Sequence, residues 1–156
     1  MADDTASGAL DEKTENAALS NALAAEHAAV WGYGVVGGAL RGSAQQQATD
    51  AETAHRDARD QVAALLAQRK ADVVDAEGAY ALPFPVLSAV DAAALGVVLE
   101  NGVSSAWVRV LDQAAERSTR ELAVGVLSAA EVRAVGWRIA AGKTPITSAF
   151  PGLPDK

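Results

Sequence analysis

The chain has 156 residues, of which half are apolar and only 4% are aromatic, and its formal net charge at neutral pH is −7. A chain of this length forms one domain, and about 68–70% of its unfolded surface can be buried in a single core, here built mainly from alanine, valine and leucine. The acidic charge argues against nucleic acid or an anionic membrane as partner, and the absence of cysteine excludes disulfides, zinc-thiolate sites and thiol nucleophiles.

The amino-terminal segment, residues 1–13, is polar and rich in small side chains, which predicts a mobile arm. It has acidic residues where a secretory signal would carry positive charge, and it lacks a continuous apolar stretch. No later apolar run approaches the ~20 residues that a membrane-spanning helix needs. We therefore expect a cytoplasmic protein that does not enter a membrane.

Apolar residues spaced alternately by four and three positions predict the first two helices of a bundle that spans residues 14–142. One such seam covers residues 19–40 and a second covers residues 48–65. The short break at residues 41–43 makes these two helices an antiparallel hairpin. Glycine and proline within residues 72–87 then prevent the second helix from continuing.

The third and fourth helices are predicted as a second hairpin. Ser88 and Asp91 fit the N-terminal cap of the third helix, which has the most regular apolar seam in the chain. Ser118 and Glu121 form a similar capping box for the fourth helix, and Gly142 ends that helix. Few residues separate these two helices, so they are expected to be antiparallel.

The long connection at residues 72–87 selects the topology. It could extend roughly 50 Å at ~3.3 Å per residue, whereas a helix of about 26 residues is roughly 39 Å long. A crossover along the bundle would make helices two and three parallel, whereas a connection that stays extended outward would let the hairpins swap between two subunits. Residues 143–156 are an extended tail, with three apolar residues that can pack back on the bundle: Ile146, Phe150 and Leu153.

The stretch Gly32-Tyr-Gly34-Val-Val-Gly37 matches the letters of a dinucleotide-binding fingerprint. That fingerprint works only where a strand turns into a helix, whereas these glycines interrupt a helical seam. Each glycine costs a helix about 1 kcal/mol relative to alanine. We interpret them as points where a neighbouring helix approaches closely, beside Trp31 or Trp107.

Three charged or polar residues occupy seam positions where leucine would be expected. They are Glu26 in the first helix, His55 in the second and Glu100 in the third. At about 1.5 Å per residue from the tight turns, Glu26 and Glu100 both lie roughly 25 Å along the bundle, and His55 lies roughly 20 Å along it. Because a buried unpaired carboxylate is costly, each acid needs a partner. Converging carboxylates and an imidazole can hold iron or manganese.

Each of these three residues also has a purely structural interpretation. His55 can be a hydrogen-bonded histidine of the core, and the two acids can form ion pairs across the bundle. Four arginines are candidates for those ion pairs: Arg41, Arg59, Arg109 and Arg133.

Two further acids could belong to the same site. Glu52 lies three residues before His55 and therefore on the same helix face, but it also fits a capping box that begins at Thr49, and plain exposure to solvent is a further interpretation. Its estimated position along the bundle is about two turns away from the level of Glu26. Glu131 either completes the ligand set or caps a helix that restarts after Gly125.

Glu26, the sequence Glu52-Thr-Ala-His55, the long crossover and Glu100 together resemble the ferritin-like superfamily. Its di-iron members use a Glu, a Glu-x-x-His, a second Glu and a second Glu-x-x-His. More narrowly, residues 16–152 resemble an alanine-rich bacterial ferritin-like family of unknown function, through AALSNALAAEHAAVWGYGVVGGAL, AYALPFPV, LENGVSSAW and AFPG. The resemblance implies an all-α, ferritin-like four-helix bundle. The second Glu-x-x-His is incomplete, because the fourth helix reads Glu131-Val-Arg-Ala.

Two functions are compatible with these residues. The missing second histidine favours a non-catalytic structural or partner-binding bundle, in which Glu26, His55 and Glu100 form a polar core that holds at most one metal ion. The alternative is a carboxylate-bridged iron or manganese oxidase or an iron-binding protein. In that case the ligands are Glu26, Glu52, His55 and Glu100, and Glu131 completes the set. The alanine- and glycine-rich faces predict a homodimer.

Overall fold

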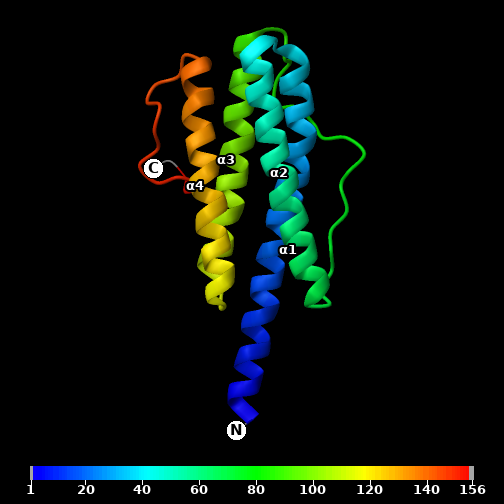
Figure 1. Ribbon diagram of the computed structural model, residues 1–156. Coiled ribbons are helices and arrows are strands. Elements are labelled where there is room, and N and C mark those ends of the chain that lie inside the picture. The colour runs from blue at the N-terminus through cyan, green and yellow to red at the C-terminus, as the bar shows by residue number, and fades with distance from the viewer. Residues whose placement is uncertain (1, 155–156) are drawn as a thin grey trace.

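A computed structural model describes residues 2–154, with side chains from residue 11 onward. Four helices form an elongated bundle (Figure 1): α1 (Ala2–Ala39), α2 (Gly42–Gln68), α3 (Ala89–Gln113) and α4 (Arg117–Ala140). The described part of the chain contains no strand. None of these helices is both long enough and apolar enough to span a bilayer.

The connections give the predicted topology. Helix α1 packs against both α2 and α3, and α3 packs in turn against α4. The two tight turns lie at opposite ends of the bundle, and residues 69–88 cross from one end to the other (Figure 1). Helices α2 and α3 therefore run in the same direction. This confirms the predicted pair of hairpins joined by a long crossover.

The crossover lies against α1 of the same chain. Three contacts hold it there: the Ser20 hydroxyl donates to the Asp72 carbonyl at 3.2 Å, His27 Nε2 lies 3.1 Å from the Val74 carbonyl, and the Trp31 and Tyr80 ring centroids are 5.8 Å apart. The three partners in α1 occur in the same order as their partners in the crossover. The connection thus follows α1 along the bundle, as the crossover topology predicts.

The apolar core consists of two clusters, one toward each end of the bundle. Leu19, Leu66 and Trp107 belong to the cluster nearer the α3–α4 turn, and Val36 and Leu95 belong to the other. All five side chains are at most 1% exposed, and full burial of each aliphatic side chain among them contributes about 1.5–3 kcal/mol. A layer of charged side chains lies where the two clusters meet.

Two glycines allow helices to approach closely. A Cβ atom on Gly32 would lie 2.6 Å from Leu99 Cδ2, and one on Gly96 would lie 2.8 Å from the Trp137 ring. The predicted close approach of a neighbouring helix is therefore confirmed at Gly32, but the nearest atoms belong to Leu99 and not to Trp31 or Trp107. Nothing lies within 4 Å of the corresponding position at Gly34, so close approach does not explain that glycine.

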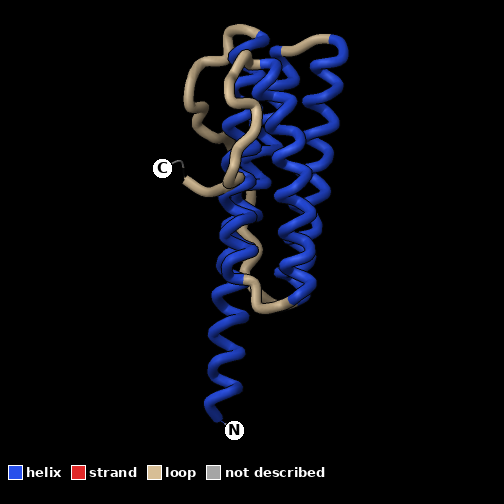
Figure 2. The backbone as a smooth tube through the Cα atoms, turned by 90° about the vertical axis from the view of Figure 1, so that its left-hand side faces the viewer, coloured by secondary structure: helices blue, strands red, loops and turns tan. Residues whose placement is uncertain are grey.

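The amino-terminal segment differs from its expected form. Residues 2–13 are helical and extend α1 beyond the rest of the bundle (Figure 2), although the sequence predicts an arm there. The segment contains no proline and several residues of high helix propensity, including alanine, leucine, glutamate and lysine. It lacks the apolar seam used to recognise the helix. Its mobility stays a prediction, and residue 1 lies outside the described residues.

The carboxyl-terminal tail contacts the bundle through its backbone. The predicted contacts of Ile146, Phe150 and Leu153 are wrong, because these side chains are 40%, 70% and 54% exposed. Instead, the Ile146 carbonyl accepts a hydrogen bond from Arg138 Nη1 at 3.2 Å. Gly152 has a φ of +78°, and a Cβ atom there would lie 2.5 Å from the Ser104 carbonyl oxygen. Residues 155–156 lie outside the described residues.

Only one of the two predicted capping boxes forms. The Asp91 N–H donates to Ser88 Oγ at 3.1 Å at the start of α3, as predicted. At the start of α4 the N-cap is Glu116, which makes no side-chain cap hydrogen bond. Ser118 lies inside the helix, and its hydroxyl donates to Glu116 Oε2 at 3.3 Å. The proposed box of Ser118 and Glu121 is therefore wrong.

Candidate functional site

Three helices each contribute one charged side chain to the middle of the core. Glu26 comes from α1, His55 from α2 and Glu100 from α3, and each is at most 1% exposed. They point into the core because each replaces an apolar residue on the buried face of its helix, and their mutual contacts show that they lie at the same level. The predicted convergence of these three side chains is confirmed.

His55 connects the two acids. Its Nδ1 lies 2.6 Å from Glu26 Oε2, and its Nε2 lies 3.2 Å from Glu100 Oε1. Burial disfavours a charged imidazole, but the hydrogen bonds and charges of the two carboxylates outweigh burial and raise the pKa of His55. A ring protonated on both nitrogens can donate to both acids at once. The geometry is therefore that of an imidazolium between two carboxylates.

Glu100 receives two further hydrogen bonds on the same oxygen. The Tyr33 hydroxyl donates to Glu100 Oε1 at 2.5 Å, and Arg133 Nε donates to it at 2.8 Å from α4. Burial alone would raise the pKa of Glu100, but the interactions with His55 and Arg133 lower it below its ordinary value. One of the four arginines considered from the sequence is thus the partner of Glu100.

Aromatic side chains complete this network. Trp107 Nε1 donates to Glu26 Oε1 at 2.7 Å, and Trp137 Nε1 donates to the Tyr33 hydroxyl oxygen at 2.7 Å. Burial, followed by the charge of Glu100, raises the pKa of Tyr33 far above its ordinary value, so the phenol stays neutral and donates. We call this set the central network: Glu26, Tyr33, His55, Glu100, Trp107, Arg133 and Trp137.

One oxygen of the central network has no partner. Glu100 Oε2 is buried and makes no hydrogen bond, whereas Glu100 Oε1 is close to three donors. With ionised carboxylates, the two negative charges of Glu26 and Glu100 are balanced by the positive charges of His55 and Arg133. The network is therefore neutral as a whole but unevenly hydrogen-bonded.

Glu52 does not reach the central network. Its side chain is 25% exposed and forms an ion pair with Arg56, one turn later in α2, at 2.6 Å. The alternative capping interpretation is also wrong, because α2 begins at Gly42 and Glu52 lies well inside the helix. The Glu-x-x-His spacing places Glu52 and His55 on neighbouring parts of α2, but only His55 faces the core.

Glu131 also lies apart from the central network. It accepts a hydrogen bond from Ser104 Oγ at 3.0 Å and lies 3.4 Å from Arg138 Nη1. Helix α4 is continuous from Arg117 to Ala140, so the interpretation of Glu131 as the cap of a helix restarted after Gly125 is wrong. Its contacts with α3 and with its own helix explain its partial burial.

The central network does not fit a metal ion in this arrangement. Among the residues with described side chains, no group of three or more His, Asp or Glu residues is placed to hold one. Both ring nitrogens of His55 and both oxygens of Glu26 already take part in hydrogen bonds. Only Glu100 Oε2 has no hydrogen bond, whereas iron and manganese take several nitrogen or oxygen ligands.

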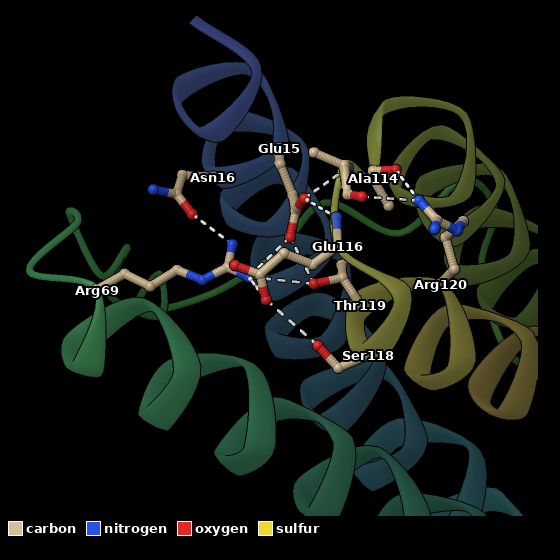
Figure 3. A network of polar contacts seen from close by, with 9 residues as sticks. Glu15, Asn16, Arg69, Ala114, Glu116, Ser118, Thr119 and Arg120 are labelled. Carbon is tan, nitrogen blue, oxygen red and sulfur yellow. Dashed lines mark hydrogen bonds and ion pairs between the residues drawn. The ribbon is translucent and has the colours of Figure 1, made fainter. Parts of the chain in front are cut away.

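A second buried carboxylate lies near the α3–α4 turn (Figure 3). Glu15 Oε1 accepts hydrogen bonds from Arg69 Nη2 at 2.7 Å and from Thr119 Oγ1 at 2.5 Å. Glu15 Oε2 accepts from the N–H groups of Ala115 and Glu116 at 2.6 and 3.0 Å. Burial would raise the pKa of Glu15, but these hydrogen bonds together lower it. We call these five residues the Glu15 network.

The Glu15 network was not identified from the sequence, although a signal was present. Glu15 lies four residues before Leu19 and so continues the apolar seam of α1 by one turn. The partners Arg69 and Thr119 are remote in sequence and have no distinctive spacing. The network joins α1 to the end of α2 and to the α3–α4 turn.

Comparisons with known proteins give a family but no activity. Residues 18–155 match the family model described as Domain of unknown function (DUF4439). The chain is similar to a solved structure described as the crystal structure of a conserved hypothetical protein, rv2844, from Mycobacterium tuberculosis. That similarity has 38% sequence identity and a TM-score of 0.81, and covers 90% of this chain and 99% of the other. No curated protein matches the chain.

Proposed function

The chain belongs to the DUF4439 family of domains of unknown function, and from that premise we propose that it is a non-catalytic structural or partner-binding bundle of ferritin-like ancestry. In this proposal the central network is a degenerate metal site. Its hydrogen bonds connect all four helices at one level and so fix their register.

The observation that carries this proposal is that both ring nitrogens of His55 contact carboxylates. A histidine that ligates a metal coordinates through one ring nitrogen and usually donates the other N–H to a carboxylate or carbonyl. Here both nitrogens lie against carboxylate oxygens, from Glu26 and Glu100. The raised pKa of His55 favours a protonated ring. An imidazolium then supplies the positive charge that a metal ion would bring.

The fourth helix gives independent support. In the ferritin-like pattern it would contribute a second histidine three residues after Glu131, but that position is Ala134, which is fully buried. The neighbouring Arg133 instead donates to Glu100 at 2.8 Å. The Arg133 guanidinium thus brings a positive charge to Glu100, whereas a second metal site would need further negative or neutral ligands there.

A second candidate function is iron or manganese binding by the same region. The unpartnered, buried Glu100 Oε2 favours it, because an oxygen in that state is a potential ligand. Binding through the full ligand set would require His55 to release one acid. Glu52 would also have to break its ion pair with Arg56. Glu131 would have to give up its contacts with Ser104 and Arg138.

Metal analysis of three purified proteins separates the two functions. The wild type, His55→Ala and His27→Ala are prepared without chelator, loaded aerobically with iron(II) or manganese(II), desalted and measured by elemental analysis. His27 is a matched control, because it adjoins Glu26 in sequence but contacts the crossover. The proposal predicts substoichiometric metal in all three. Stoichiometric metal in the wild type and His27→Ala, lost in His55→Ala, would establish the second function.

The partner in this proposal is a second copy of the chain. A groove of about 440 Å³ between α2 and α4 has a floor of small and apolar residues that include Ala54, Ala58 and Val126, and charged or polar residues also line it, namely Asp57, Gln61, Glu121 and Arg133. Val132 lies seven residues after Gly125, and therefore on the same side of α4, and its side chain is 75% exposed.

Light scattering should show a dimer that Val132→Asp dissociates. The matched change Val90→Asp, at an exposed position of α3, should not dissociate it, and a monomeric wild type would contradict this arrangement.

A further inference from the structure

A separate cavity of about 330 Å³ lies between the carboxyl-terminal tail and the helices α3 and α4. Its volume is at the lower end of the range for small-molecule sites, about 300–1,000 Å³. Asn101 and Ser105 line it from α3, Glu131 and Arg138 from α4, and Thr147 from the tail. None of its lining residues belongs to the central network. The cavity is therefore independent of the function proposed above.

The cavity contains a buried guanidinium whose contact with a carboxylate is long. Arg138 is only 7% exposed. Its Nη2 donates to Asn101 Oδ1 at 2.9 Å and its Nη1 donates to the Ile146 carbonyl at 3.2 Å. The nearest acid oxygen, Glu131 Oε2, is 3.4 Å away, which is long for a charge-assisted hydrogen bond. Buried arginines usually bind carboxylates through two short parallel hydrogen bonds.

The carboxylate of Glu131 also lacks a short hydrogen bond on one of its two oxygens. One of its oxygens accepts from Ser104 Oγ at 3.0 Å, and the other makes only the long contact with Arg138. The cavity thus presents one positive and one negative group side by side. A simple anion would be repelled by Glu131, and a simple cation would be repelled by Arg138. A ligand that carries both charges on neighbouring atoms matches this pair.

We propose that this cavity binds a free α-amino acid, with its carboxylate at Arg138 and its ammonium group at Glu131. Such a zwitterion would replace one long ion pair by two short charge-assisted hydrogen bonds. Asn101, Ser105 and Thr147 add polar groups around the charged end. The remaining wall includes apolar parts of the tail, namely Pro145, Ala149 and Leu153, which suit an aliphatic side chain such as that of leucine.

Contacts with α3 and α4 hold the tail in place as one wall of this site. Gly152 has a φ of +78°, which L-residues rarely adopt, and a Cβ atom there would lie 2.6 Å from Val108 Cγ2 and 2.5 Å from the Ser104 carbonyl oxygen. Only glycine allows the chain to pass this close to α3. The tail is also held to α4 through the hydrogen bond between Arg138 and the Ile146 carbonyl. The cavity is thus lined by three parts of the fold, namely α3, α4 and the tail.

Calorimetric titration of the full chain tests the proposal with three probes of nearly equal shape. L-leucine carries both charges, 4-methylpentanoate lacks the ammonium group, and 3-methylbutylamine lacks the carboxylate. Leucine is expected to bind, and each analogue is expected to bind at least about tenfold more weakly, because it leaves one charged group of the site unpaired. No binding of leucine at millimolar concentration, or equal binding of all three, would overturn the proposal.

A charge-neutral variant identifies the site. Glu131→Gln keeps the shape of the side chain but removes its charge. It should weaken leucine binding by about tenfold and leave 4-methylpentanoate binding unchanged or tighter. Glu121→Gln, at an exposed position of the same helix, is the matched control and should bind leucine like the wild type. Unchanged leucine binding by a folded Glu131→Gln protein, with folding checked by circular dichroism, would place the amino acid elsewhere and overturn the assignment. Metal analysis of His55→Ala bears only on the central network, so the two proposals fail separately.

Discussion

Two acids of α1, Glu15 and Glu26, are both at most 1% exposed, but their charges are stabilised by different kinds of donor. Glu15 accepts two backbone N–H groups of the α3–α4 turn, together with Arg69 and Thr119. Glu26 accepts only from side chains, namely His55 and Trp107. One acid is therefore held by the fold itself, and the other by a neighbouring group that can lose its proton.

The difference shows that burial of a charge alone does not mark a functional site. In the Glu15 network every donor stays a donor at neutral pH, and Arg69, whose side chain is 10% exposed, still reaches solvent. In the central network the bridging donor is a histidine, whose charge depends on pH. The Glu15 network has a structural role, because its hydrogen bonds join α1 to the end of α2 and to the α3–α4 turn. The central network retains titratable groups that a purely structural core does not require.

Removal of the bridging imidazole should have the largest effect on stability. His55→Leu leaves the carboxylates of Glu26 and Glu100 facing each other in the core without a cation between them. Breaking a buried ion pair in this way costs about 3–5 kcal/mol. Urea unfolding at pH 7 measures the loss, and His27→Leu is the control, with an expected loss below about 1 kcal/mol. Similar small losses in both variants would contradict the role given to His55.

A rise in pH should reproduce part of that loss in the wild type. The pKa of His55 is raised in the folded protein above its ordinary value of 6.5. Its contribution to stability is therefore fully present below about pH 6.5 and is lost as the pH rises through the folded-state pKa. Unfolding free energies measured across this window should decline in the wild type. A parallel decline in His55→Leu would show that another group is responsible.

Loss of Glu15 should have a smaller effect than loss of His55. In Glu15→Ala the guanidinium of Arg69 can turn to solvent, so we expect a loss of about 2–3 kcal/mol from the charged hydrogen bonds. Because the folded-state pKa of Glu15 is lowered, its contribution is present above about pH 4.3 and lost as the pH falls through the folded-state value. The wild type and Glu15→Ala should therefore converge in acid, as measured by urea unfolding. Divergence would contradict this assignment.

Removal of the Tyr33 hydroxyl should have a moderate effect. Tyr33→Phe takes a donor from Glu100 and leaves the Trp137 N–H without its acceptor. One buried unsatisfied group corresponds to about 1–3 kcal/mol. Thermal unfolding should show this loss with the native circular dichroism spectrum retained. A neutral effect would mean that the hydroxyl is not part of the network in solution.

The smallest effect is expected at Glu52. Its ion pair with Arg56 is partly exposed and spans one helical turn, so Glu52→Ala should cost about 0.3–0.5 kcal/mol. The pH dependence of unfolding should stay as in the wild type. A loss as large as that of His55→Leu would place Glu52 in the central network after all.

The sequence was informative where helical periodicity determines position. A polar residue on an apolar seam must face the core, which is why Glu26, His55 and Glu100 could all be placed there. The tight turns did not fix their common level, because these turns lie at opposite ends of the bundle (Figure 1). The Glu15 network escaped prediction because it depends on backbone N–H groups of a turn and on Arg69, which no periodic pattern relates to Glu15. The unpartnered oxygen of Glu100 depends on side-chain rotation, which the sequence does not specify.

The tail was mispredicted for a related reason. Apolar residues such as Phe150 suggested side-chain contacts with the bundle, but the conformation of Gly152 sets the path of the tail. Glu52 was predicted to belong to the site because it lies three residues before His55. Spacing alone does not determine which of two residues on adjacent parts of a helix surface faces the core.

The most direct test of the central claim is the protonation state of His55, read from the ring nitrogens by long-range ¹H–¹⁵N NMR at pH 7, with the assignment made by comparison with His55→Leu. We predict that both nitrogens carry protons and that added iron(II) or manganese(II) leaves the two signals unchanged. A ring with one unprotonated nitrogen whose signal is lost when the metal is added would contradict the account and make His55 a metal ligand.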